Sequence, residues 1–326
     1  MGKGKLLIMD SQAEGVFELS DIAGNIRLHQ VWNDGASTLT FEYPRQGGRR
    51  FSNGSTVTFT YDGAPMFYGY LQRTGGNRER FQCTCADQLR YFKPTNTILR
   101  KEIPLSDWLN VVASAVSDGD RIRLGSIDST GVNLSKKLFD NKSHLDMLYD
   151  AIRENLGLNG YWYTLFDNFG QLDLVDTLDL RLPLVIGDES LCTGFEYEKA
   201  IDDGVANYIK LAKDDEKAGV RKVYVAQDSA NIAKWGKIMH YEKVTTDRND
   251  AQMQQLAQML LLIKNKEAQS LKLDAIGDTR VHAGSGIKVE LHQENISAWM
   301  VVESVTHIFT SSQHTMSLNL RWGEWT

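Results

Sequence analysis

The sequence contains few cysteines and few prolines, three and five respectively among 326 residues. Three cysteines cannot all pair within one chain, and their spacing matches no disulfide framework, so we expect the chain to fold in a reducing compartment. Since prolines are few and no low-complexity segment interrupts the sequence, we expect closely coupled domains rather than domains separated by a long linker.

Long apolar runs and an excess of positive charge are missing as well. The apolar run at residues 6–9 is too short for a secretion signal, and the run at 259–263 is too short to span a membrane. The formal net charge of -6 provides no overall attraction to nucleic acid or to an anionic membrane. We therefore expect no membrane partner and no specific nucleic-acid binding.

The first part of the sequence has a β-type pattern. Residues 1–100 include short alternating segments such as "STLTFEY", "GSTVTFTY" and "RFQCTCA", separated by turn sequences such as "YDGAP" and "RTGGN". Strands at this spacing are typical of a small barrel or sandwich. The length of the chain suggests about two domains, with a third possible. We assign residues 1–100 to a first β-barrel domain.

The pattern of residues 101–188 is mixed. Ser106 is a good N-cap for a helix with apolar residues at helical spacing, and Ser143 is expected to cap a second helix that ends at Gly157. The segment "GYWYTLFDNFGQLDLVD" then predicts a hairpin that turns at residues 167–170. We assign residues 101–188 to a mixed α/β middle domain.

A β-type pattern returns in residues 189–326, which we assign to a second β-barrel domain with an inserted helix at about 247–267. The sequence therefore predicts an α+β fold that is mainly β, in which two related small β-barrel domains flank a mixed α/β middle domain. The buried face of the inserted helix is expected to contain Met253, Leu256, Ala257, Leu260 and Ile263.

An internal similarity suggests that the two barrels are related. "NGSTVTFTY" (53–61) aligns without gaps with "AGSGIKVEL" (283–291), which places Gly54 with Gly284 and Ser55 with Ser285. A turn and a strand follow each segment, and there the alignment places Leu71 with Val305. Chance similarity between two β meanders is the alternative. If the similarity reflects a repeat, chains with two like modules can form rings with twice as many modules as chains.

Residues 301–322, "VVESVTHIFTSSQHTMSLNLRW", contain two histidines close together. If "TSSQ" is a four-residue turn, Phe309 pairs with His314 and His307 pairs with Met316. Both histidines then lie on the apolar face as diagonal neighbours roughly 7 Å apart. Because no Cys, Asp or second His pair lies beside them at ligand spacing, we interpret them as packing residues of the closing hairpin rather than metal ligands.

Other candidate motifs also favour structural roles. "CTC" places Cys83 and Cys85 on one strand face, as expected for buried thiols. "AGSG" at 283–286 leads into a strand and lacks the Lys-Ser/Thr of a phosphate-binding loop. The sequence contains no nucleophile elbow, no H-E-x-x-H zinc motif and no dinucleotide fingerprint. We therefore assign no catalytic, cofactor-binding or metal-binding residue and expect a protein that is not an enzyme.

Five segments, in consistent order over most of the chain, carry a family resemblance: "DGAPMFYGYLQR", "CADQLRYFKPTNTI", "ANYIKLA", "GDTRVHAGSGIKVEL" and "VESVTHIFTSSQHTMSLNL". The most specific motif is S-x-T-H followed by H-T-M-x-L near the C-terminus, and "DQLRY" is the next most specific. Together these segments resemble the baseplate hub proteins of contractile phage tails, in particular those of defective prophage elements and tail-like particles of Gram-positive bacteria.

The resemblance implies a phage tail hub-like fold and a homotrimer, in which three chains with two similar barrels each form a pseudo-six-fold ring. One face of the ring would receive the tail tube protein, and the other would carry the central spike protein, alongside other baseplate proteins. The tape-measure protein would pass through the lumen. The resemblance also implies a place in the baseplate of a virion or phage-tail-like particle, assembled in the bacterial host cytoplasm. Since the sequence stops at "WGEWT", we expect no appended cell-wall hydrolase domain and no cofactor.

Two other functions are alternatives. A duplicated β-rich carbohydrate-binding module on a tail or cell surface is favoured if segments such as "YWYTLF" form exposed aromatic platforms. A cell-wall hydrolase would use carboxylates dispersed along the sequence. Trp325, beyond the last strand, is a candidate contact with a partner. His307 and His314 are further candidates if they face a neighbouring subunit.

The interface hypothesis for the histidines predicts a pH-dependent assembly, because histidine charges between about pH 5 and 8. The double variant His307→Gln, His314→Gln is then expected to lose the pH dependence of oligomerisation, measured by light scattering after size exclusion. An unchanged pH profile would remove the interface hypothesis and leave the packing role.

Overall fold

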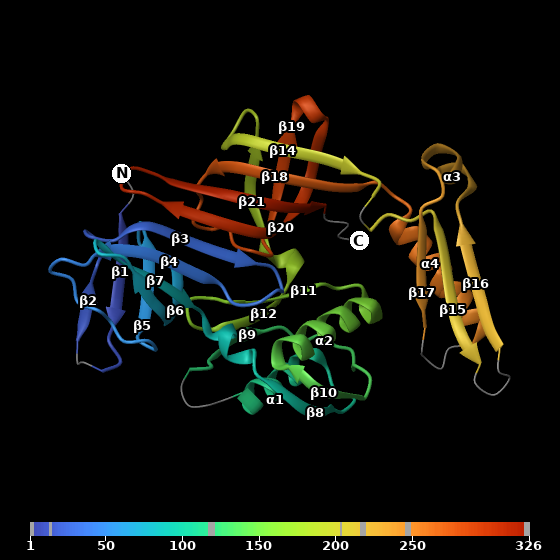
Figure 1. The fold of residues 1–326 in the computed structure, drawn as a ribbon, viewed down its shortest axis with the longest axis horizontal. Coiled ribbons are helices and arrows are strands. Elements are labelled where there is room, and N and C mark those ends of the chain that lie inside the picture. Colours follow the sequence, from blue (N-terminus) through green and yellow to red (C-terminus); the bar gives the residue numbers. More distant parts are fainter. Residues whose placement is uncertain are drawn as a thin grey trace. The chain divides into compact units, whose positions relative to one another are not determined.

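The computed structural model describes residues 3–12, 15–116, 121–202, 204–215, 220–244 and 249–322. The fold is mainly β, as the sequence predicts (Figure 1). The chain separates into two compact units. The larger unit combines Met1–Phe195 with Lys272–Thr326, and the smaller unit, Glu196–Leu271, is an insertion in the sequence of the larger one.

The larger unit begins with an antiparallel N-terminal module, whose strands lie in the order β3-β4-β7-β6-β5-β1, with β2 (Val16–Glu18) outside β1. Every second residue of β4 and β5 is buried, because these strands pack one face against a core. Aromatic rings such as Phe41, Phe59 and Phe81 fill this core. The strands are β1 (Gly4–Met9), β3 (Gly24–Val31), β4 (Thr38–Pro44), β5 (Thr56–Tyr61), β6 (Ala64–Gly76) and β7 (Arg80–Ala86).

A C-terminal module repeats this strand order. Its strands lie in the order β14-β18-β21-β20-β19-β13. When the six strands of each module are numbered in chain order, both modules therefore show the same spatial order, 2-3-6-5-4-1. One difference is that β13 runs parallel to β19, whereas β1 runs antiparallel to β5. The strands are β13 (Arg181–Gly187), β14 (Cys192–Ala200), β18 (Ala268–Ile276), β19 (Gly286–Leu291), β20 (Ile296–Phe309) and β21 (His314–Trp322).

The Gly-Ser turns before β5 and β19 make matching backbone hydrogen bonds. The Gly54 N–H donates to the Leu71 carbonyl oxygen (2.7 Å), and the Leu71 N–H donates to the Ser55 carbonyl oxygen (2.8 Å). Gly284 and Ser285 make the same two bonds with one residue of β20, at 2.8 and 2.9 Å. Gly54 and Gly284 have φ angles of +87° and +92°, which favour glycine. The local geometry therefore supports a repeat.

The residue of β20 that corresponds to Leu71 is Val302, so the alignment of Leu71 with Val305 was wrong. That alignment assumed too long a turn between β19 and β20. The corrected correspondence also matches two β-bulges, because the strand register shifts around Gln72 in β6 and around Glu303 in β20.

The two modules join edge to edge in one 13-stranded sheet (Figure 1). Residues 304–309 of β20 pair antiparallel with residues 26–31 of β3. At the end of this ladder the Phe309 ring enters the core of the N-terminal module, with its centroid 4.8 Å from that of Phe59. Closure of either module into a barrel stays a prediction.

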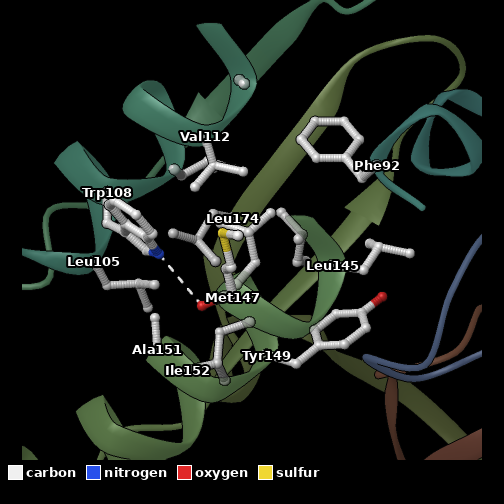
Figure 2. Packing of buried hydrophobic residues seen from close by; sticks show 14 of the residues in the cluster. Phe92, Leu105, Trp108, Val112, Leu145, Met147, Tyr149, Ala151, Ile152 and Leu174 are labelled. Carbon is white, nitrogen blue, oxygen red and sulfur yellow. Dashed lines mark hydrogen bonds between the residues drawn. The ribbon is translucent and has the colours of Figure 1, made fainter. Parts of the chain in front are cut away.

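The middle region packs two helices over small strands, around a core that includes Trp108 (Figure 2). The Trp108 Nε1–H donates to the Met147 carbonyl oxygen at 3.3 Å, and its ring stacks on Phe139. The predicted hairpin corresponds to β11 and β12. The elements are η1 (Gln88–Phe92), β8 (Thr95–Arg100), α1 (Leu105–Val116), β9 (Leu124–Ile127), β10 (Lys137–Ser143), α2 (His144–Asn159), β11 (Tyr163–Asp167), β12 (Leu172–Asp176) and η2 (Thr177–Leu180).

The helix ends agree only partly with the sequence prediction. Ser143 caps α2 as predicted, because its hydroxyl accepts from the Asp146 N–H at 3.0 Å. The helix does not end at Gly157 but at Asn159, and Gly160, with a φ of +80°, is its C-cap. Helix α1 starts before Ser106, which therefore lies inside the first turn and is not its N-cap. None of the helices in the described ranges is long and apolar enough to cross a membrane.

The smaller unit is more than the single inserted helix that the sequence predicts. A three-stranded sheet, in the order β16-β15-β17, packs against α4 (Asp250–Lys264). Met253 and Ala257 are fully buried and Leu256 and Leu260 are partly buried, but Ile263 is 55% exposed, so its predicted burial was wrong. The remaining elements are β15 (Tyr208–Asp215), β16 (Val220–Gln227), α3 (Ser229–Trp235) and β17 (Met239–Lys243).

The Trp108→Ala variant is expected to lower the free energy of unfolding by about 3–5 kcal/mol, because it leaves a cavity where a fully buried ring packs. The matched control is Val111→Ala on the same helix, where the side chain is 44% exposed and the change should stay within about 0.5 kcal/mol. Urea unfolding followed by circular dichroism measures both. Equal effects of the two substitutions would contradict the packing of α1.

Candidate functional site

The two histidines predicted from sequence lie in the hairpin of β20 and β21. The strand register is the predicted one, with His307 opposite Met316 and Phe309 opposite His314. The turn between the strands occupies residues 310–313. His307 is 0% exposed and His314 is 7% exposed, so both rings are buried within the chain. We refer to them as the histidine pair.

The histidine pair forms a short chain of hydrogen bonds. His307 Nε2 lies 2.9 Å from the Val281 carbonyl oxygen, an acceptor, so this nitrogen carries the hydrogen. His307 Nδ1 is then an acceptor, and it lies 2.9 Å from His314 Nε2, which donates to it. The two rings are therefore in direct contact rather than about 7 Å apart. A backbone carbonyl from the loop before β19 therefore supplies the hydrogen-bond partner of His307.

Burial lowers the pKa of both histidines. The pKa of His307 falls to about 3, first because its ring is removed from water and next because a charge on His314 would repel it. The pKa of His314 falls to about 4, mainly because of burial. Both rings are thus neutral at pH 7, which is the state that the hydrogen-bond chain requires.

The histidine pair consists of two buried, uncharged rings that pack inside the chain. Within the residues that the structure describes, no group of three or more His, Cys, Asp or Glu side chains is placed to hold a metal ion. Cys83 and Cys85 are buried in the N-terminal module as free thiols. Contact of His307 and His314 with a partner stays a prediction, and Trp325 lies outside the described residues.

A second cluster, which sequence reasoning missed, connects the three parts of the larger unit. Trp32, just after β3, donates from its backbone N–H to the Glu303 carbonyl oxygen (2.9 Å) and from Nε1 to Thr164 Oγ1 (2.8 Å). Its ring centroid lies 4.8 Å from that of Trp162. A Cβ on Gly284 would approach Thr164 Cγ2 to 2.6 Å, so the cluster requires glycine there. No local sequence pattern marks these residues as neighbours. We call Trp32, Trp162, Thr164 and Gly284 the tryptophan joint.

Two buried carboxyl groups were also missed. The Asp87 carboxylate accepts from the backbone N–H groups of Ser37 (2.7 Å) and Leu89 (2.9 Å), and Asp167 accepts from the Gly170 N–H (2.8 Å). Burial raises the pKa of both groups above the ordinary range, and the nearby charge of Asp167 raises the pKa of Asp87 further. Their hydrogen bonds cap η1 and hold the β11–β12 turn, which gives both groups a structural role.

Comparison with known proteins agrees with this architecture. The chain is 25% identical over 281 residues to the phage-like element PBSX protein XkdQ of Bacillus subtilis, with 85% of each chain covered. It superimposes on the 43 kDa tail protein of prophage MuSo2 from Shewanella oneidensis with a TM-score of 0.70 at 8% identity, covering 99% of this chain and 97% of the other. A tail protein from Neisseria meningitidis gives a TM-score of 0.68 at 13% identity, covering 98% and 96%.

The fold is therefore that of prophage tail proteins. A family model described as YQBQ-like matches residues 26–321, so the chain belongs to the YQBQ-like family. These findings confirm the resemblance to tail proteins of defective prophage elements that several sequence segments indicated.

The histidine pair predicts a loss of stability in acid. Its folded pKa values lie below the ordinary value of 6.5, so the unfolded chain binds more protons as the pH falls below that value. The stabilisation is fully present above pH 6.5 and is lost toward pH 4 and 3, by up to about 1.4 kcal/mol per pH unit for each histidine. The double variant His307→Gln, His314→Gln should flatten this slope, measured by urea unfolding at several pH values.

The control is His292→Gln, because Asp188 raises the pKa of His292 through a hydrogen bond and its charge. Stabilisation by His292 is present below pH 6.5 and is lost as the pH rises through the folded pKa. The His292→Gln variant should therefore change the pH dependence of the free energy of unfolding above pH 6.5. It should leave in place the slope between about pH 5 and 6.5, which the histidine pair sets. If the slope of the double variant equals that of the unaltered chain, the histidine pair is not neutral in the folded state.

Proposed function

We propose that this chain is the structural hub of a contractile phage-tail-like baseplate. Three copies form a ring that adapts the six-fold tail tube to the three-fold spike and encloses the central channel. The observation that carries this proposal is the duplication: two modules with one strand order, joined edge to edge within a chain. Three such chains in a ring present six like modules.

The parts that are not duplicated support the same role. The middle region, from η1 to η2, follows the N-terminal module only. The smaller unit, Glu196–Leu271, is inserted only in the C-terminal module, where it begins within β14 and ends within β18. In a ring of three chains the modules repeat six times, whereas these parts repeat three times. A ring built this way can offer six-fold and three-fold surfaces to different partners.

Under this proposal the partners are two further copies of the chain, the tail tube protein, the central spike protein and other baseplate proteins, with the tape-measure protein in the lumen. The location is the baseplate of a virion or phage-tail-like particle, assembled in the bacterial host cytoplasm. The chain acts by assembly, without turnover. The division into domains at 1–100, 101–188 and 189–326 is part of the proposal.

The segment that would favour a carbohydrate-binding module has a different role in the fold. Of the aromatic residues in "YWYTLF", Tyr161 is exposed, but Trp162 packs on Trp32 and Tyr163 is buried. Phe166 stacks on a histidine ring, with centroids 4.7 Å apart. One exposed tyrosine is not the aromatic platform that this alternative requires, so the segment favours the structural role.

The proposal predicts a trimer in solution. Three copies of the 36.8 kDa chain weigh about 110 kDa, and light scattering after size exclusion measures this mass directly. Imaging of the trimer should then show a ring with six similar lobes around a channel. A strict monomer at every concentration and pH would contradict the hub, and glycan-array binding by the same preparation would favour the carbohydrate-binding module.

A further inference from the structure

One end of the N-terminal module is rich in arginine. The loop between β4 and β5 contributes three arginines within residues 45–50, and the hairpin of β6 and β7 contributes three within residues 73–80. All six side chains are exposed, although the formal net charge of the whole chain is -6. We call these residues the arginine patch: Arg45, Arg49, Arg50, Arg73, Arg78 and Arg80.

The two segments that carry the arginine patch lie side by side. The Arg45 N–H donates to the Glu79 carbonyl oxygen at 2.8 Å. Farther along the loop, Arg50 Nη2 donates to the Thr74 carbonyl oxygen at 3.4 Å, and Thr74 Oγ1 donates to Asn53 Oδ1 at 3.4 Å. Because these contacts hold the loop against the hairpin, the six arginines belong to one surface.

Aromatic rings position two arginines of the patch. Arg45 Cζ lies 4.2 Å from the ring centroid of Phe81, and Arg49 Cζ lies 5.1 Å from that of Phe17. A guanidinium is attracted to the face of such a ring, and the contact restricts the side chain. A side chain that is already restricted loses less conformational entropy when it binds a partner. Arg45 and Arg49 are therefore prepared for binding before a partner arrives.

Carboxylates of the chain offset only part of this positive charge. Asp10 is the one described residue that forms an ion pair with the patch, with its Oδ2 3.1 Å from Arg49 Nη2, and the Arg49 side chain is still 48% exposed. Residues 45–50 include no acidic residue, and residues 73–80 include Glu79 alone. The patch therefore keeps an excess of positive charge that a partner can neutralise.

We propose that the arginine patch is a docking site for an acidic segment of a partner protein, whose Asp and Glu side chains pair with the guanidinium groups. This inference goes beyond the proposed function, because it requires no ring and joins no copies of this chain. The planar fork of arginine can donate two parallel hydrogen bonds to one carboxylate, and arginine is enriched in protein interfaces.

The position of Glu79 favours a protein partner over a nucleic acid. Glu79 lies between Arg78 and Arg80 in the sequence of the hairpin. A DNA duplex carries one negative charge about every 1.7 Å along its axis, so it would bring phosphates close to this carboxylate. A protein segment can place carboxylates opposite the arginines and a neutral or basic residue opposite Glu79. The net charge of -6 also repels a long polyanion beyond the patch.

The backbone among the arginines is accessible as well. Gly47 lies in the loop and Gly75 lies in the hairpin, and a Cβ built on either residue meets no atom within 4 Å. The main chain of a partner can therefore approach both segments closely while its side chains reach the arginines on either side.

Fluorescence anisotropy with a model peptide tests the site. The probe is a fluorescein-labelled peptide of alternating glutamate and serine, and a peptide of alternating glutamine and serine is its neutral counterpart. The unaltered chain should bind the acidic peptide but not the neutral one, with an affinity that falls as salt increases. The variant Arg50→Gln, Arg73→Gln, Arg78→Gln should bind the acidic peptide about tenfold more weakly, because it loses three exposed charge pairs of modest strength.

The matched control removes three exposed positive charges from the middle region, through Lys101→Gln, Lys136→Gln and Arg153→Gln. It changes the net charge by the same amount, and the affinity for the acidic peptide should change less than about twofold, because these charges lie outside the patch. An equal loss of affinity in the two variants would show that overall charge holds the peptide, and it would overturn the inference. The inference also fails if the unaltered chain does not bind the acidic peptide at low salt.

A fluorescein-labelled DNA duplex is the competing probe. The acidic peptide should bind more tightly than the duplex at the same salt concentration. Tighter binding of the duplex, lost in the variant of Arg50, Arg73 and Arg78, would assign the patch to nucleic acid and overturn the proposed protein partner.

Light scattering of the same samples separates the docking site from the proposed function. The patch variant should have the same mass as the unaltered chain, whereas a lower mass would show that the patch joins copies of the chain and would overturn the inference. A trimer that does not bind the acidic peptide would overturn the docking site and leave the trimeric hub standing. A monomer that binds the peptide through the patch would support the docking site and contradict the hub.

Discussion

The architecture of the larger unit depends on one shared strand, β20. Its first half pairs with β19 in the C-terminal module, and its second half pairs with β3 of the N-terminal module, while β21 follows its other edge. The bulge at Glu303 lies where β20 changes partner. Since backbone groups of a buried strand must be paired on both edges, the two modules are held in one register. The Phe309 ring completes the N-terminal core, so that module depends on residues near the end of the chain.

The histidine pair and the tryptophan joint both contact this shared strand. His307 and His314 bring polar nitrogens into a core, where an unpaired nitrogen would be costly. The two rings bond to each other and His307 bonds to the Val281 carbonyl oxygen, so these hydrogen bonds offset the cost of burial. Trp32 binds the bulge at Glu303 and packs on Trp162 of the middle region. These contacts fix the relative positions of the three parts of the larger unit.

Under the proposed function, the repeat would allow one chain to serve two symmetries. The Gly-Ser turns, the bulges and the strand order are common to both modules, which indicates that each is a copy of one building unit. The middle region and the inserted unit then make the modules unequal. Under that proposal, a ring of three chains would be six-fold in its modules and three-fold in its additional parts.

Local patterns in the sequence determined strands such as β4, β5 and β7, the Ser143 cap, the hairpin register of His307 and His314, and the Gly54–Gly284 match. These depend on alternation, capping and turn chemistry between near neighbours. The tertiary structure decided the partner of His307, the match of Leu71 with Val302, the tryptophan joint and the exposure of Ile263. Each of these depends on which segments distant in sequence come together. An alternating pattern indicates which face of a strand is buried, but it does not specify which segment packs against that face.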